Sequence, residues 1–514
     1  MAVLRGIAVA LLLTGCQHTV RNHTHPDITD ADIKKGKQLA STYCKGCHLL
    51  PQPSLLDAGT WERGVLPYMG PWLGIFSSGL VHYPNSSRDK FLDKNFYPSQ
   101  PLLKPEEWKT LMSYYIATAP DSLPRQKRPY PIQNDLSLFK VDSTSSGHSK
   151  PATCFIRVDT SGGKRSLLLG DVIKKSLVRL DDKLNVVDSV HFSGPIVDLD
   201  IQKGSMIACD IGILNPTNGK FGKAYRIALR PDGRMMVDTV PLLDSLARPV
   251  QITAVDLNRD GLTDYLICEF GNLTGALSWM ENTGNGNFKR HVIRAVPGAI
   301  KAYIRDDNHD GLPDLWVLFA QGDEGIFHFT NQGNGKFKEE PLLRFPPVYG
   351  SSYFELADFN HDGYPDIVYT CGDNADYSTV LKPYHGVYIF MNDGTNHFSQ
   401  KYFFPINGCY KAMARDFDGD GDLDLAVISF FADYRHQPEE GFVYLENTGN
   451  FQFKPHTLAS GKAGRWLTMD AGDLNGDGKP DILLGNFSVA PGFIRSSVDW
   501  TKSPPFLFLE NTGK

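Results

Sequence analysis

A nine-residue pattern rich in acidic residues occurs five times in the second half of this 514-residue chain. It reads Asp-x-Asn/Asp-x-Asp-Gly-x-x-Asp, and its copies begin at Asp256, Asp306, Asp358, Asp416 and Asp473. Successive copies start 50, 52, 58 and 57 residues apart. Repeats of this kind indicate a solenoid, a propeller or another array, because each repeat is one structural unit that packs on the next.

Each copy is followed by a short apolar run, such as residues 265–267 or 482–484, and later by a second β-rich run with an Asn/Gly turn. This pattern predicts about four strands per repeat. It resembles the FG-GAP/VCBS β-propeller family, whose repeat also occurs in integrin heads. Two degenerate repeats without the acidic loop lie at residues 166–171 and 196–210. We therefore predict an all-β propeller of seven blades over residues 151–514, with six or eight blades as alternatives.

The acidic loops have the oxygen ligands and the sharp glycine bend of a calcium site. In the family that they resemble, the ninth-position aspartate closes the site. The alternative is that these residues only form hairpin turns. The fourth loop has the most carboxylates, so we expect it to bind most tightly. The predicted calcium ligands are Asp256, Asn258, Asp260 and Asp264; Asp306, Asn308, Asp310 and Asp314; Asp358, Asn360, Asp362 and Asp366; Asp416, Asp418, Asp420 and Asp424; and Asp473, Asn475, Asp477 and Asp481.

A different motif, Cys-Lys-Gly-Cys-His, occupies residues 44–48. Two thiols two residues apart and an adjacent histidine are the attachment sequence of a c-type haem. Cys44 and Cys47 would form thioether bonds, and His48 would be the proximal iron ligand. A redox dithiol would not need the histidine, and a zinc site would need further ligands nearby.

Predicted helices flank this motif at residues 30–40 and 105–116, which resembles a class I cytochrome c. The resemblance implies a small all-α domain over residues 31–120 that precedes the propeller. The family often uses a methionine just before the last helix as the sixth iron ligand, but residues 91–104 contain none. Met69, between Gly and Pro residues, is our candidate. His82 would give bis-histidine ligation, and Met112 lies on an apolar helix face that suits core packing.

The N-terminus predicts export. Arg5 precedes a short apolar run and the sequence Leu-Thr-Gly-Cys at residues 13–16. This resembles a bacterial lipobox, which implies a signal peptide over residues 1–15, a lipidated Cys16 and a tether over residues 16–30. Gln17 favours the outer membrane of a bacterial cell envelope. An ordinary secretory peptide is the alternative.

The Pro-rich, polar segment 121–150 is predicted to be a linker, and its basic cluster at residues 125–128 a solvated turn. Five further cysteines lie mostly in strand-like runs and are predicted to be core thiols. The net charge of −6 argues against nucleic-acid binding. Four cations precede the acidic loops at the expected start of the inner strands. With nearby aromatic residues, they suggest a funnel for a sugar-like or anionic ligand, although a hydrated channel is the simpler interpretation. These cations are Arg248, Lys301, Lys411 and Arg465.

Together these features suggest a lipid-anchored electron-transfer protein with a redox partner protein, in which a calcium-stabilised propeller serves as scaffold. Two alternatives stay open. The propeller could be a quinoprotein-like sugar or alcohol dehydrogenase that reduces its own haem, or the chain could be a surface adhesion or glycan-binding module.

Overall fold

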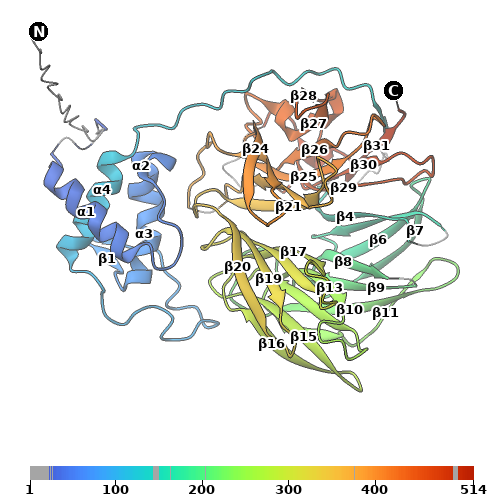
Figure 1. Ribbon diagram of the computed structural model, residues 1–514, viewed down its shortest axis with the longest axis horizontal. Helices are drawn as coiled ribbons and strands as arrows, with labels where there is room; N and C mark the ends of the chain where they lie inside the picture. Colours follow the sequence, from blue (N-terminus) through green and yellow to red (C-terminus); the bar gives the residue numbers. More distant parts are fainter. Residues whose placement is uncertain are drawn as a thin grey trace, which may run out of the picture.

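The computed structural model contains a helical region followed by a ring of β-sheets (Figure 1). No helix within the described residues combines the length and the apolar character needed to cross a membrane. The residues that the structure describes are 22–23, 25, 27–142, 150–161, 164–202, 204–375, 377–489 and 496–513.

Two crossing helices, α1 (Asp30–Tyr43) and α4 (Pro105–Thr118), organise the helical region. Both were predicted, and each runs slightly further than expected. Thr29 and Asp32 cap α1 reciprocally, since each side chain accepts a hydrogen bond from the other backbone N–H. The helices meet at Gly36, where an added Cβ would lie 2.7 Å from the Cβ of Tyr114. Glycine is required at this crossing because no larger residue leaves room for the second helix.

Shorter elements connect these two helices. They include a one-turn π-helix that continues directly into α3, and a small exposed hairpin. The elements are η1 (Pro53–Leu55), α2 (Ala58–Thr60), the π-helical turn η2 (Trp61–Val65), α3 (Leu66–Met69), η3 (Gly70–Leu73), β1 (Ser77–Ser78) and β2 (Val81–His82).

The ring consists of seven antiparallel sheets, so the prediction of a seven-bladed propeller is confirmed. Contacts between inner strands run around the whole ring, from β4 through β8, β13, β17, β21, β25 and β29 back to β4. In sequence order the blades are as follows: β4 (Thr153–Asp159), β5 (Ser166–Asp171), β6 (Ser176–Asp181), β7 (Val186–His191); β8 (Ile196–Gln202), β9 (Ser205–Asp210), β10 (Gly222–Leu229), β11 (Met235–Val237), with β12 (Leu243–Leu246) beside β10; β13 (Pro249–Val255), β14 (Asp264–Glu269), β15 (Ala276–Gly284), β16 (Asn287–Arg294); β17 (Ala299–Arg305), β18 (Asp314–Phe319), β19 (Gly325–Asn331), β20 (Phe337–Arg344); β21 (Ser351–Ala357), β22 (Asp366–Cys371), β23 (Gly386–Asn392), β24 (Phe398–Pro405); β25 (Cys409–Arg415), β26 (Asp424–Ser429), β27 (Phe442–Asn447), β28 (Phe453–His456); β29 (Trp466–Gly472), β30 (Asp481–Asn486), β31 (Phe506–Asn511), β3 (Phe139–Asp142).

The hydrophobic core lies between neighbouring blades. The second strand of blades 3 to 7 is buried along its whole length, because both of its faces are covered. One cluster joins blades 3 and 4 through Trp279 and Phe327, and equivalent clusters join the other pairs. The five remaining cysteines, Cys154, Cys209, Cys268, Cys371 and Cys409, are buried and unpaired, as predicted.

The last blade is built from both ends of the propeller sequence. Its outer strand, β3, precedes blade 1 in the sequence. It pairs with β31, so that Phe139 lies opposite Asn511. This corrects the predicted linker over residues 121–150 and the predicted start of the propeller at residue 151. The physical reason is ring closure: β3 covers the free edge that β31 would otherwise expose.

The segment before β3 is fastened along the side of the ring (Figure 1). Arg128 pairs with the buried carboxylate of Glu440 and donates a 3.1 Å hydrogen bond to the carbonyl of Pro405. Gln126 donates to the carbonyls of Lys382 and His385 at 3.0 and 2.8 Å. Gln126 and Arg128 of the basic cluster therefore dock on the ring, which corrects the predicted solvated turn for these two residues, whereas Arg125 and Lys127 are exposed.

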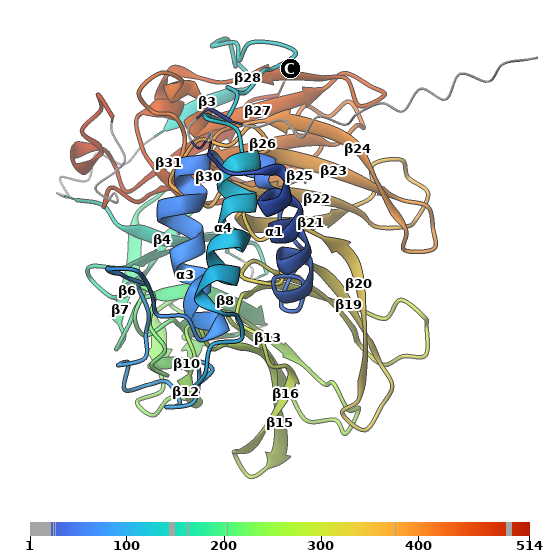
Figure 2. The ribbon, with the colours of Figure 1, turned by 90° about the vertical axis from the view of Figure 1, so that its left-hand side faces the viewer.

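The helical region lies over one face of the ring, as Figure 2 shows. It contacts the connection between β20 and β21 at Val348, the connection between β22 and β23 at Tyr384, and the connection between β9 and β10 at Asn218. Along an antiparallel blade the connections alternate between the two faces. The acidic loops, which all connect a first to a second strand, therefore open on the opposite face.

Candidate functional site

The two thiols and the imidazole of residues 44–48 follow directly after α1. Cys44 caps the helix, because its backbone N–H donates to the carbonyl of Ala40 at 2.9 Å. Its side chain packs against the helical core, and this burial raises the pKa of the thiol to about 11. Cys47 is exposed.

The ring of His48 is held by a neighbouring backbone group. Its Nδ1 lies 2.8 Å from the carbonyl oxygen of Leu49. This geometry suits the tautomer in which Nδ1–H donates to the carbonyl and Nε2 keeps its lone pair. In metal-binding histidines, a hydrogen bond from the ring nitrogen that does not bind the metal generally fixes the orientation of the ring. Two thiols and an available Nε2 form a set that can make two thioether bonds and one bond to iron.

The three candidates for a sixth ligand differ in their surroundings. His82 lies on the exposed β1–β2 hairpin, next to Val81 with 61% of its surface exposed. The sulfur of Met112 accepts a hydrogen bond from the Tyr83 hydroxyl at 3.5 Å. Met69 ends α3, is half-buried, and packs against the same core as Cys44. Met69 thus combines shielding from water with a sulfur for which no hydrogen bond is found within the described ranges.

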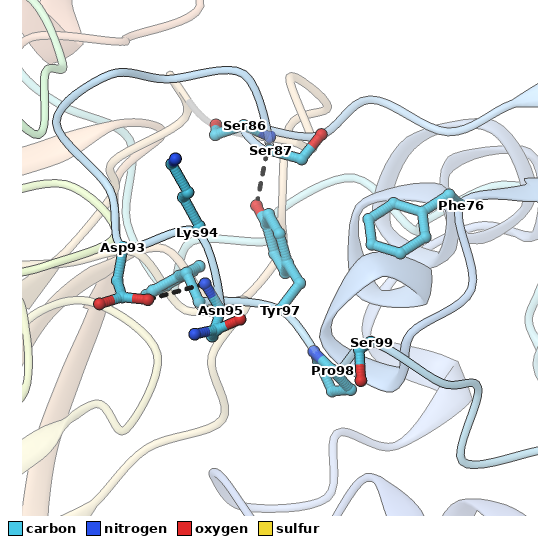
Figure 3. Close-up of a pocket in the computed structure, with 10 residues that line it drawn as sticks. Phe76, Ser86, Ser87, Asp93, Lys94, Asn95, Tyr97, Pro98 and Ser99 are labelled. Atoms are coloured by element: carbon cyan, nitrogen blue, oxygen red, sulfur yellow. Dashed lines mark hydrogen bonds between the residues drawn. The ribbon is translucent and has the colours of Figure 1, made fainter.

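A cavity of about 370 Å³ lies beside this region, and Figure 3 shows it in close-up. It is lined by Phe76 and by residues of the loop 86–99, where the backbone N–H of Ser86 donates to the Tyr97 hydroxyl at 3.3 Å. The loop also reaches the propeller, because Asn218 donates to Asp89 at 2.8 Å. None of the predicted haem ligands lines this cavity.

The five acidic loops share one backbone arrangement. The sixth-position glycine has a positive φ in every copy, for example +82° at Gly261 and +96° at Gly421. In four copies its N–H donates to the first aspartate, as from Gly421 to Asp416 at 3.1 Å. The sharp bend expected from the sequence is therefore present.

The ninth-position aspartate is fully buried in all five copies. Asp424 shows the pattern: its carboxylate accepts N–H bonds from Phe417 at 3.3 Å and from Asn447 at 2.8 Å. Burial, with a smaller contribution from the nearby Asp418, raises the pKa of this carboxyl to about 7. These aspartates therefore tie each loop to its own blade, a role that the spacing alone did not reveal.

The loops differ at the third position. In the fourth loop, carboxylate oxygens of Asp416, Asp418 and Asp420 all lie within 4.8 Å of one another. In the first three loops the third-position asparagine donates to the fifth-position aspartate, as from Asn258 to Asp260 at 3.0 Å. The fourth loop thus has the densest negative charge, which is the arrangement that favours a divalent cation.

The second loop contains a polar cluster that the repeat pattern does not predict. Its second position is Asp307, where the other loops have buried Leu or Phe. Asp307 accepts hydrogen bonds from Trp316 at 2.5 Å and from His328 at 3.1 Å. These donors and Arg305 hold the pKa of Asp307 at about 2. Because its oxygens are already engaged, we interpret the cluster as a packing element of blade 4.

The four predicted funnel cations do not form a free cationic rim. Arg465 is fully buried, donates to the carbonyl of Phe430 at 3.0 Å and stacks on its ring. Arg248 donates to the carbonyl of Leu214 at 2.8 Å. These two arginines therefore brace connections on the helical side of the ring.

Lys301 and Lys411 line the channel, but acidic residues surround them. Lys411 donates to the carbonyl of Met469 at 2.7 Å, and burial lowers its pKa to about 8. Arg157 lies 3.7 Å from both Asp198 and Asp470, and bridges strands of three blades. The predicted cationic funnel is thus corrected to a channel of mixed charge, because Asp198 acts electrostatically on Lys301 and Asp470 on Lys411, and both carboxylates flank Arg157.

Comparison with known proteins supports the repeat. A family profile described as FG-GAP-like repeat matches residues 256–317, 306–369 and 416–484. A T-cell immunomodulatory protein homolog of Plasmodium falciparum is 28% identical over 236 residues, which cover 38% of this chain and 32% of that protein. Integrin alpha-PS5 of Drosophila melanogaster is 34% identical over 151 residues, which cover 24% and 14%. The chain therefore spans less than a third of the length of either relative.

Solved structures resemble the ring at low sequence identity. BBS1N in a complex with ARL6DN has a TM-score of 0.45 and 10% identity over 74% of this chain and 99% of its own. Sqt1 of Saccharomyces cerevisiae has a TM-score of 0.43 and 9% identity over 75% of this chain and 100% of its own. The chain itself carries FG-GAP repeats that close into a seven-bladed β-propeller.

Proposed function

We propose that this protein is an exported electron-transfer protein that binds one covalent haem c at residues 44–48, with the FG-GAP propeller as its scaffold. The observation that supports this most directly is the placement of the His48 ring. Its Nδ1 lies 2.8 Å from the Leu49 carbonyl oxygen, which favours the tautomer with a lone pair on Nε2, and Cys44 and Cys47 of the same motif are both free thiols. When bound, a haem supplies a one-electron couple.

The residues of the chain have separate tasks in this proposal. Cys44 and Cys47 attach the group to the end of α1, and His48 is the proximal ligand. Met69 is the sixth ligand that we favour, because it is half-buried in the same core as Cys44. A methionine–histidine pair would raise the potential relative to two histidines.

The propeller would be stabilised by up to five calcium ions. The first, third, fifth and ninth positions of each loop would supply oxygen ligands, and the fourth loop would bind most tightly. A cation would relieve the repulsion among the neighbouring carboxylates of Asp416, Asp418 and Asp420. The role of these loops would be structural.

The proposed location is the bacterial cell envelope, with an anchor through acyl chains on Cys16. This residue lies outside the described residues. Mass spectrometry of the N-terminal peptide tests the anchor, since a Cys16→Ser variant would lack the lipid mass and leave the membrane fraction.

Absorption spectroscopy of protein from a host that matures c-type cytochromes tests the haem. We expect a haem spectrum that survives denaturation in wild-type protein and is lost in the Cys44→Ala/Cys47→Ala double variant. His82→Ala serves as a control, because the exposed hairpin should not affect attachment. Colourless wild-type protein would refute the proposal. Reduction of the haem by a sugar or an alcohol alone would favour the dehydrogenase over the carrier.

A further inference from the structure

We propose that the propeller positions Met69 through two tyrosines and a valine on the connection between β22 and β23. We call Tyr377, Val380 and Tyr384 the blade-5 clamp. The inference rests on the proposed haem, and it makes the propeller a determinant of the sixth ligand in addition to a scaffold. Three contacts between the clamp and residues 55–69 support the inference.

The first contact is a stack of two aromatic rings. Tyr377 lies against Tyr68, with ring centroids 4.1 Å apart and an angle of 23° between the ring planes. Tyr68 immediately precedes Met69 in α3. A shift of the Tyr68 ring would therefore shift the backbone that carries the methionine.

The second contact is an approach of two backbones. An added Cβ on Gly64 would lie 2.5 Å from the carbonyl oxygen of Tyr377. Only glycine allows the π-helical turn Trp61–Val65 to come this close to the propeller. This turn leads without interruption into α3, so Tyr377 contacts the segment that carries Met69 at two positions, Gly64 and Tyr68.

The third contact is made by Tyr384, which is partly buried in the core of the helical region together with Val380. Its hydroxyl donates to the carbonyl of Leu55 at 3.0 Å and lies 3.3 Å from the carbonyl of Val348. The ring stacks on Tyr349 at 4.6 Å between centroids. The ring is thus fixed within the propeller while its hydroxyl holds the helical region.

The dependence of Met69 on these contacts follows from the shortness of its helix. α3 has four residues, and the π-helical turn before it has five. Helical segments of this length are not stable alone in water, because nucleation costs more than so few hydrogen bonds return. Tertiary contacts must therefore fix the segment, and the clamp supplies those on the propeller side.

A purely structural role of the clamp predicts a different outcome. Loss of the stack would then lower the unfolding temperature without changing the haem. A positioning role also predicts that the sixth ligand becomes weaker. The decisive readouts are therefore the reduction potential and the binding of carbon monoxide to the reduced protein, which requires an open sixth position.

The experiment compares Tyr377→Ala, Tyr377→Phe, Tyr384→Phe and Met69→Ala in the haem-loaded full chain. Tyr130→Ala, a change at an exposed tyrosine before β3, is the control. We expect Met69→Ala to lower the potential and to bind carbon monoxide, and Tyr377→Ala to move both readouts in the same direction. Tyr377→Phe, which keeps the ring, and Tyr130→Ala should match the wild type.

Two results would overturn the inference. The first is a coloured Tyr377→Ala protein with the potential of the wild type and no binding of carbon monoxide. The second is a Met69→Ala protein with an unchanged potential. If Tyr377→Ala does not fold, Tyr384→Phe decides, since it removes one hydroxyl and keeps the ring. We then expect this variant to have a lower potential and to bind carbon monoxide, and wild-type values of both would overturn the inference. Wild-type protein without haem would instead refute the proposed function itself, so the two failures can be told apart.

Discussion

The hydroxyl of Tyr384 in blade 5 donates a 3.0 Å hydrogen bond to the backbone carbonyl of Leu55 in the helical region. This bond joins two parts of the chain that are 329 residues apart in sequence. It lies in a contact from which water is largely excluded, and this burial raises the pKa of the Tyr384 hydroxyl far above its ordinary value.

Replacement of Tyr384 by phenylalanine should loosen the contact between the two regions. The Leu55 carbonyl would lose its partner, and a buried acceptor without a partner costs about 1–3 kcal/mol. We expect a lower unfolding temperature and faster proteolysis in the helical region, measured by calorimetry and limited digestion. Tyr130→Phe is the matched control, because Tyr130 is exposed. Equal digestion of both variants would contradict the prediction.

A second prediction concerns the crossing of α1 and α4. In a Gly36→Ala variant the new methyl group would meet the Thr110 carbonyl and the Tyr114 side chain. Overpacking of this kind costs about 1–3 kcal/mol, so the helical region should unfold at a lower temperature. Gly46→Ala is the control, since nothing lies within 4 Å of its added Cβ. Circular dichroism at 222 nm measures both variants. A Gly36→Ala protein that unfolds like the wild type would show that the helices can separate without cost.

The five acidic loops made most of the propeller predictable from the sequence. Each loop marks the start of a buried second strand, as Asp424 does for β26, so both the period and the strands could be inferred. The channel could be predicted only in part. The spacing placed Lys411 correctly on an inner strand, but the acceptor of its hydrogen bond is Met469 of the next blade. A pattern within one repeat contains no information about such partners.

The closure of the ring could not be predicted for a similar reason. β3 has only four residues, has no acidic loop, and pairs with a strand near the opposite end of the chain. The contacts of Tyr377 were equally hidden, because its partner Tyr68 belongs to a separate region of the sequence. Local patterns thus predicted the blades and the helices, whereas the contacts between distant segments required the structure.

The closing strand leads to a third prediction. Phe139 of β3 is buried between blades 6 and 7, with its ring 5.9 Å from those of Phe417 and Tyr444. A Phe139→Ala variant should lose about 3–5 kcal/mol of the free energy of unfolding, because a cavity would remain at the closure. Lys140→Ala, on the exposed face of the same strand, should lose little. Chemical denaturation monitored by fluorescence measures both. Comparable losses in the two variants would mean that pairing of the strand, and not its core residue, closes the ring.

The last prediction links calcium to pH through Asp424. Burial raises the pKa of this fully buried carboxyl from 3.8 to about 7. Because the folded-state pKa lies above the unfolded value, the protonated group stabilises the fold below about pH 4, and this contribution is lost as the pH rises to about 7. Without calcium, the unfolding temperature should therefore fall between pH 5 and pH 8.

Bound calcium should offset the loss, and it contributes about 2.7 kcal/mol per site at a hundredfold excess over its Kd. Calorimetry with calcium or with a chelator at both pH values measures this effect. Asp424→Asn removes the titrating group, so its chelated form should show a weaker pH dependence. Its single side-chain oxygen can accept from Phe417 or from Asn447 but not from both, because these donors bond to different oxygens of Asp424, so the variant should also be less stable at every pH. A calcium-induced rise in unfolding temperature that is as large at pH 5 as at pH 8 would show that the buried carboxylates are not what the cation stabilises.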